Sequence, residues 1–117
     1  MRDPKKLRAF ELADALALAV YERTRGFPRE EQFGLTTQMR RATVSVASNI
    51  VEGCARRSQA DYVRFLDMAY GSAQELTYQV SLAHRLGYLK PEPFQALDAA
   101  CTETCKVLNG LICSMRE

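Results

Sequence analysis

Apolar residues recur at helical spacing along four stretches of the 117-residue chain. From Tyr62 to Ala83 the apolar positions alternate steps of four and three residues, which places them on one stripe of an α-helix. The same alternation runs from Phe94 to Met115. Glycine, proline and capping residues separate the stretches. The pattern predicts helices over roughly residues 6–24, 36–55, 59–86 and 93–115, and a short helical turn near 29–33.

Residues with strong capping preferences stand at several of these boundaries. Thr36 and Thr37 are N-cap types at the start of the second stretch, and Ser58 with Asp61 has the spacing of a capping box. Gly87 is a typical residue to follow the last turn of a helix. We therefore expect these residues to begin the second and third helices and to end the third.

Four helices joined by short connections predict an all-α fold, an antiparallel up-down-up-down four-helix bundle. The length is that of one ordinary domain, so residues 1–117 are expected to form a single bundle. A hydrophobic content of 47% and a charged content of 26% are ordinary for a globular protein and exclude a disordered tail or a fibre.

The first two predicted helices have more apolar surface than one bundle core needs. Each has one apolar stripe for the core and a second strip beside it, and Leu18 lies on an otherwise polar side. The second strips comprise Phe10, Ala13, Ala17 and Tyr21 in the first helix, and Val44, Ala47 and Val51 in the second. We expect this surplus to form a contact between subunits of a homo-oligomer. The alternative is deeper burial within one subunit.

A polar stripe runs along the second predicted helix between its two apolar strips. Its members are Gln38, Arg41, Ser45, Asn49 and Glu52, and the third helix offers Ser72, Glu75 and Gln79 as counterparts. Buried polar groups need partners, so we expect a structural polar network in which Arg41 pairs with Glu75 and Asn49 pairs with the backbone or Glu52. A functional surface groove is the alternative.

Basic residues concentrate in the first half of the chain. Residues 1–60 contain eleven basic and seven acidic residues, whereas residues 65–117 contain four and six. Arginine and lysine bind phosphate groups, so we expect RNA or DNA backbone to bind at Lys5, Lys6, Arg40, Arg56 and Arg57. The alternative is a solvated, partly salt-bridged face. Tyr70 and Tyr78 are the best positioned aromatic residues for stacking on bases, although their spacing fits packing better.

Signals for an enzyme or a cofactor are weak. The single histidine, His84, lacks the Arg-x4-His and Glu-x-x-His contexts of helical ribonucleases and bundle metal sites. Cys101 and Cys105 lie one helical turn apart and offer a metal site with Cys54 or His84, but packing as small apolar residues is favoured. We expect no catalysis, no metal and no cofactor. Four cysteines without a C-x-x-C pair, and no signal-peptide pattern, predict reduced thiols and a cytoplasmic location.

Short motifs along most of the chain resemble those of a known family. They include Phe33-Gly34-Leu35-Thr36, Asn49-Ile50-Val51-Glu52-Gly53, Asp61-Tyr62, Ala69-Tyr70-Gly71-Ser72 and Leu86-Gly87-Tyr88-Leu89. The chain is similar in these residues to the S23 family, four-helix bundles encoded by intervening sequences in 23S ribosomal RNA genes. Val51 departs from the pattern, since many members have alanine there.

The resemblance implies an antiparallel four-helix bundle that assembles as a homo-oligomer, typically a ring of five. A related branch is the accessory variability determinant of diversity-generating retroelements, which binds nucleic acid and a reverse transcriptase. Two functions follow as expectations. The first is a non-enzymatic ring that binds RNA or DNA backbone. The alternative is a protein scaffold, such as an accessory subunit for a reverse transcriptase, with nucleic acid incidental.

Overall fold

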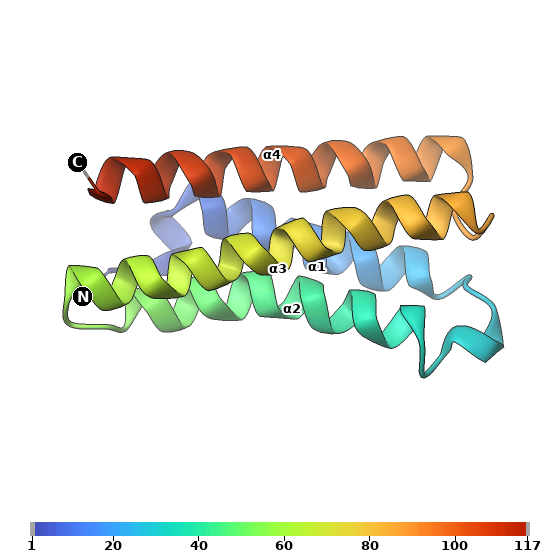
Figure 1. The fold of residues 1–117 in the computed structure, drawn as a ribbon, viewed down its shortest axis with the longest axis horizontal. Helices are drawn as coiled ribbons and strands as arrows, with labels where there is room; N and C mark the ends of the chain where they lie inside the picture. Colours follow the sequence, from blue (N-terminus) through green and yellow to red (C-terminus); the bar gives the residue numbers. More distant parts are fainter. Residues whose placement is uncertain (1, 117) are drawn as a thin grey trace.

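Four α-helices run back and forth along the long axis of the molecule (Figure 1). The structure is a computed structural model that describes residues 2–116. The helices are α1 (Arg8–Thr24), α2 (Leu35–Cys54), α3 (Gln59–Arg85) and α4 (Pro91–Arg116), with 3-10 turns η1 (Pro4–Lys6) and η2 (Arg29–Glu31). Among these residues, each helix packs against its two neighbours and not against the diagonal one. The predicted all-α, antiparallel up-down-up-down four-helix bundle is confirmed.

The core follows the predicted stripes closely. All seven α3 positions expected on the seam, from Tyr62 to Ala83, are buried. In α4 the middle of the stripe is buried, but Phe94, Leu111 and Met115 are only half-buried, and Ile112 fills the core near the C-terminal end. Within residues 2–116, no helix has both the length and the apolar character needed to cross a membrane.

The ends of α3 are stabilised as its sequence predicts. The Ser58 hydroxyl accepts a hydrogen bond from the Asp61 amide at 3.1 Å, which caps the first turn. At the other end Gly87 has φ +86°, a left-handed conformation that glycine adopts without strain. The Tyr88 amide then donates to the Ala83 carbonyl at 2.9 Å and completes a Schellman motif.

The start of α2 differs from the prediction, because neither Thr36 nor Thr37 caps it. The helix begins at Leu35, whose amide donates to Glu31 Oε1 at 3.0 Å, while the Tyr88 hydroxyl donates to Glu31 Oε2 at 2.8 Å. These two hydrogen bonds lower the pKa of the Glu31 carboxyl, and the bond to Glu31 raises the pKa of the Tyr88 hydroxyl. A Cβ at Gly34 would lie 2.6 Å from Glu31 Oε1, so glycine leaves room for this carboxylate.

Helices α2 and α3 approach closely where the chain turns from one to the other. Gly53 is buried on α2, and a Cβ built there would lie 2.9 Å from Phe65 Cβ and 3.3 Å from Tyr62 Cδ1. A side chain at position 53 would therefore push the two helices apart at this end of the bundle.

We predict that Gly53→Ala destabilises the protein by about 1–3 kcal/mol, because the added methyl group overpacks the contact with Phe65. Urea unfolding followed by circular dichroism measures the effect. Gly110→Ala is the matched control, since Gly110 is exposed on α4 and has open space around it. It is expected to gain about 0.5–1 kcal/mol from helix propensity. Equal effects of the two substitutions would show that overpacking at Phe65 is not the cause.

Candidate nucleic-acid interface

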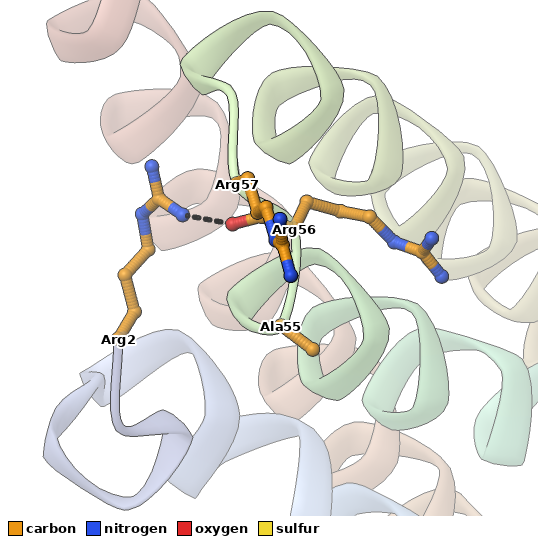
Figure 2. Close-up of a pocket in the computed structure, with 4 residues that line it drawn as sticks. All are labelled: Arg2, Ala55, Arg56 and Arg57. Atoms are coloured by element: carbon orange, nitrogen blue, oxygen red, sulfur yellow. Dashed lines mark hydrogen bonds between the residues drawn. The ribbon is translucent and has the colours of Figure 1, made fainter.

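Three arginines gather at one end of the bundle, around the connection between α2 and α3. Arg56 and Arg57 are exposed in that connection, and Arg2 reaches the same place from the N-terminal segment (Figure 2). Together with Ala55 they line a hollow of about 670 Å³. The fold thus joins a residue near the start of the chain to two residues more than fifty positions later.

Aromatic rings and a carbonyl hold two of these guanidinium groups, those of Arg2 and Arg56, in place. Arg2 donates to the Arg56 carbonyl oxygen at 3.0 Å, and its guanidinium carbon lies 4.0 Å from the centre of the Tyr62 ring. The Arg56 guanidinium carbon lies 4.6 Å from the centre of the Phe65 ring. Arginine in such cation–π contacts keeps N–H groups free for a ligand while its plane is fixed.

Four acidic residues lie near this end in sequence, and none forms an ion pair with its arginines. Asp3 accepts a hydrogen bond from the Lys5 amide at 3.0 Å, and Glu52 is exposed. Asp61 pairs with Arg64 at 3.6 Å, and Asp67 pairs with Arg116 at 2.5 Å. Among residues 2–116, no carboxylate lies within 4.0 Å of the guanidinium groups of Arg2, Arg56 or Arg57. The three arginines therefore have positive charge that no ion pair within the described residues neutralises, which suits an anionic ligand.

Lys5 and Lys6 extend the same positive surface. Both are exposed in η1, which packs against α2 and closely follows Arg2 in the chain. We use the term arginine end for Arg2, Arg56 and Arg57 together with these two lysines. Four of the five residues expected to bind nucleic acid thus lie together, and Arg2 joins them. Arg2 was not among the expected residues, because its place depends on the path of the N-terminal segment.

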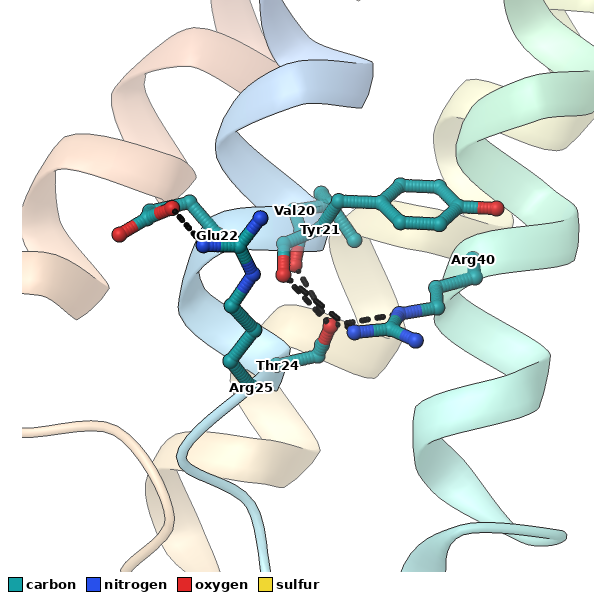
Figure 3. A network of polar contacts seen from close by, with 6 residues as sticks. All are labelled: Val20, Tyr21, Glu22, Thr24, Arg25 and Arg40. Carbon is teal, nitrogen blue, oxygen red and sulfur yellow. Dashed lines mark hydrogen bonds and ion pairs between the residues drawn. The ribbon is translucent and has the colours of Figure 1, made fainter.

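Arg40, the fifth expected residue, lies elsewhere and has a different role. About 20 Å of helix separates it from the end of α2. Its Nε donates to Thr24 Oγ1 at 2.9 Å, and its guanidinium carbon lies 4.6 Å from the centre of the Tyr21 ring (Figure 3). The Thr24 hydroxyl in turn donates to the Val20 carbonyl at 2.8 Å. Arg40 therefore ties the last turn of α1 to α2 and is separate from the arginine end.

The polar stripe of α2 faces α3 and lines a groove of about 460 Å³. The Ser45 and Ser72 hydroxyls lie 2.8 Å apart, and Asn49 Nδ2 donates to the Ser45 carbonyl at 2.9 Å and to its hydroxyl at 3.0 Å. The groove is lined by Gln38, Arg41, Ala42, Ser45, Ser72 and Glu75. We name this surface the polar groove.

One expected partnership of the polar stripe, the ion pair of Arg41 with Glu75, is not formed among the described residues. Arg41 and Glu75 line the same groove, but no ion pair within 4.0 Å joins them. Glu75 instead accepts a hydrogen bond from Gln79 Nε2 at 3.1 Å. Asn49 bonds to the backbone carbonyl of Ser45, one of its two expected partners, and not to the exposed Glu52. The groove therefore contains two opposite charges that do not pair with each other.

The remaining candidate residues occupy structural positions. His84 stacks on Phe94 with ring centres 4.1 Å apart, and its Nδ1 lies 2.9 Å from the Leu89 carbonyl oxygen. Burial raises the pKa of Cys101 to about 12, which keeps that thiol protonated. Within the part of the chain that the structure describes, no three histidine, cysteine or acidic side chains are grouped so that they could hold a metal.

The candidate stacking residues lie on α3. Tyr78 is exposed and has the Arg85 guanidinium carbon 5.9 Å from its ring centre, while the half-buried Tyr70 accepts a hydrogen bond from Gln74 Nε2 at 2.8 Å. Three or more turns of α3 separate both tyrosines from the loop that contains Arg56 and Arg57. They therefore lie apart from the arginine end.

Comparison with known proteins places these features in a family. The pattern of the 23S rRNA-intervening sequence proteins matches residues 5–110. The chain belongs to this family. A crystal structure of a protein of unknown function from the S23 ribosomal protein family of Bacteroides thetaiotaomicron has a similar fold, with a TM-score of 0.80 and 24% sequence identity. The similarity covers 89% of this chain and 97% of that one. No curated protein matches the chain.

We predict that Arg40→Ala destabilises the protein by about 1–3 kcal/mol, because it removes a charged hydrogen bond to Thr24 and the contact with Tyr21. Thermal unfolding measures the effect. Arg41→Ala, one position later and exposed, is the control and is expected to change stability by less than about 0.5 kcal/mol. If both variants unfolded at the same temperature as the wild type, the contacts of Arg40 would not stabilise the packing of α1 against α2.

Proposed function

We propose that this chain is a non-enzymatic, self-assembling four-helix bundle that binds RNA or DNA backbone through its arginine end. The observation that carries the proposal is the hollow lined by Arg2, Arg56 and Arg57, whose guanidinium groups have no carboxylate in salt-bridge range among the described residues. Arginine contacts phosphate oxygens through two parallel N–H donors, and such contacts have no sequence preference of their own.

Self-assembly is supported by apolar side chains that the bundle leaves exposed on α1 and α2. Leu18 is 71% exposed, and Tyr21 follows it by one turn on the same helix. Tyr21 and Val44 line a common hollow of about 520 Å³, and Val51 lies two turns further along α2. These four residues, named the apolar strip, form a surface that a second copy would cover.

Assembly would repeat the arginine end once in every subunit. The resemblance to the S23 bundles implies a ring of five, and contact with several subunits at once strengthens the binding of a long polyanion. A cytoplasmic location, as expected from the reduced thiols, would give the protein access to RNA.

We predict that short single-stranded RNA binds at about 50 mM salt and that its affinity falls steeply as salt increases, because phosphate contacts release counterions. Arg57→Gln is expected to weaken binding and to reduce the slope of log affinity against log salt by about 1. Fluorescence anisotropy at several salt concentrations gives both quantities.

Arg23→Gln is the matched control, because Arg23 is exposed near the far end of α1 and loses the same charge. It is expected to leave the slope nearly unchanged. If RNA does not bind at about 50 mM salt, where these contacts are strongest, the proposal is wrong. If Arg23→Gln and Arg57→Gln weaken binding equally, the arginine end is not the site.

We predict that the wild-type chain sediments as an oligomer of its 13.2 kDa protomer and that Leu18→Glu dissociates it. The side chain is largely exposed in the protomer, so the substitution should place charge in the subunit contact without unfolding α1. Met68→Glu, an exposed apolar position on α3, is the control and should keep the oligomer. Sedimentation equilibrium measures the mass of each variant in solution. A wild-type monomer at micromolar concentration would contradict self-assembly.

The scaffold function has one observation in its favour. Phe33, between η2 and α2, is 88% exposed, and Leu86 at the end of α3 is half exposed on the same end of the bundle. Such side chains are typical anchors for a protein partner, such as a reverse transcriptase. Capture of a partner that survives nuclease treatment and is lost in Phe33→Ser would favour the scaffold over nucleic-acid binding.

A further inference from the structure

Gln79 on α3 supports a charged residue of the polar groove, Glu75, although Gln79 does not itself line the groove. Gln79 is only 6% exposed, and its Nε2 donates to Glu75 Oε2 at 3.1 Å. Its Oε1 is buried and has no hydrogen-bond partner among the described residues. That oxygen is closed to solvent, so Gln79 acts at the groove through its Nε2, which holds the Glu75 carboxylate; a carboxylate can accept further hydrogen bonds.

The two walls of the groove differ in chemistry. The α3 wall offers an acceptor, the Glu75 carboxylate. The α2 wall offers donors, namely the exposed Arg41 guanidinium and the Gln38 amide. Among residues 2–116, no ion pair closes the space between Arg41 and Glu75. A ligand that bridges the walls must therefore have donors on one edge and acceptors on the other.

Guanine has this arrangement. Its N1–H and N2 amino group lie side by side and fit one carboxylate, and its O6 and N7 accept two hydrogen bonds from one arginine. Uracil has a single ring donor between two acceptors. Adenine and cytosine place a lone pair beside their amino group, which would face the carboxylate. The groove volume of about 460 Å³ lies within the range of small-molecule sites.

We propose that the polar groove binds a guanine base of single-stranded RNA or DNA, with Glu75 accepting from its N1–H and N2 amino group and Arg41 donating to its O6 and N7. The inference rests on the proposed function, because the arginine end supplies backbone affinity and the groove adds a preference for one base. Unstacked bases in single strands present these edges to proteins.

The test compares short uridine RNAs of equal length that contain, in the middle, guanosine, inosine or only uridine. The guanosine RNA should bind roughly tenfold or more tightly than the uridine RNA. Inosine lacks the N2 amino group and should lose most of this advantage. Glu75→Gln should abolish the preference while the uridine RNA still binds. The readout is the ratio of the affinities for the guanosine RNA and the uridine RNA. An effect of the lost charge that is equal for both RNAs therefore cancels.

Glu52→Gln is the matched control, since Glu52 is an exposed carboxylate on α2 outside the groove lining. It should keep the guanosine preference. Equal binding of guanosine and uridine RNAs would overturn the inference and leave backbone binding intact. A change of oligomeric mass in Glu75→Gln, with the base preference retained, would identify the groove as a subunit contact and also overturn it.

A second readout keeps the inference testable without the arginine end. Guanosine monophosphate and adenosine monophosphate are titrated separately into isotope-labelled protein, and the amide resonances of Ser45, Ser72 and Gln79 are followed. Shifts with the guanine nucleotide alone are expected. If neither nucleotide, or both equally, shift these resonances, the groove does not select guanine, whatever the RNA assays show.

Discussion

The close packing of α2 against α3 sets the positions of both the arginine end and the polar groove. Gly53 lets the helices meet at Tyr62 and Phe65, and further along the same seam the hydroxyls of Ser45 and Ser72 lie 2.8 Å apart. Small side chains keep the interhelical distance short. The tight connection after α2 then places Arg56 and Arg57 at the end of the bundle, and the seam itself forms the floor of the polar groove.

Three arginines that line one hollow repel one another, and the surrounding structure offsets part of that repulsion. The faces of Tyr62 and Phe65 attract the cations, and the Arg56 carbonyl accepts from Arg2 near the C-terminal, partly negative end of α2. Burial raises the pKa of both the Tyr62 hydroxyl and the Cys54 thiol beneath this end, so the layer below the arginines is neutral. An anionic ligand would relieve the remaining repulsion.

The helices and the core were predictable from the sequence, because a 3.6-residue period directly reflects which face of a helix is buried. The residues at which helices begin, and the partners of charged side chains, were harder to predict. Neighbouring residues on a helix point about 100° apart. For this reason Arg40 contacts α1 whereas Arg41 lines the polar groove, although the two residues are neighbours in the sequence.

Long-range contacts explain the other differences between the sequence predictions and the structure. Glu31 begins α2 because Tyr88, far along the chain, holds its second oxygen, and no local pattern contains that information. Arg2 joins Arg56 for the same reason. Helical spacing thus predicts which residues share a face but not which of them bond, as the bond from Gln79 to Glu75 on one helix shows.

The central claim is that nucleic-acid backbone binds at the arginine end, and mapping the contact by NMR tests it most directly. Unlabelled single-stranded RNA is titrated into isotope-labelled protein at low salt, and the amide shifts are followed along the chain. The account predicts the largest shifts at residues 2–6 and 55–58. Shifts confined to the opposite end, around Thr24 and Phe33, or no shifts at all, would contradict it.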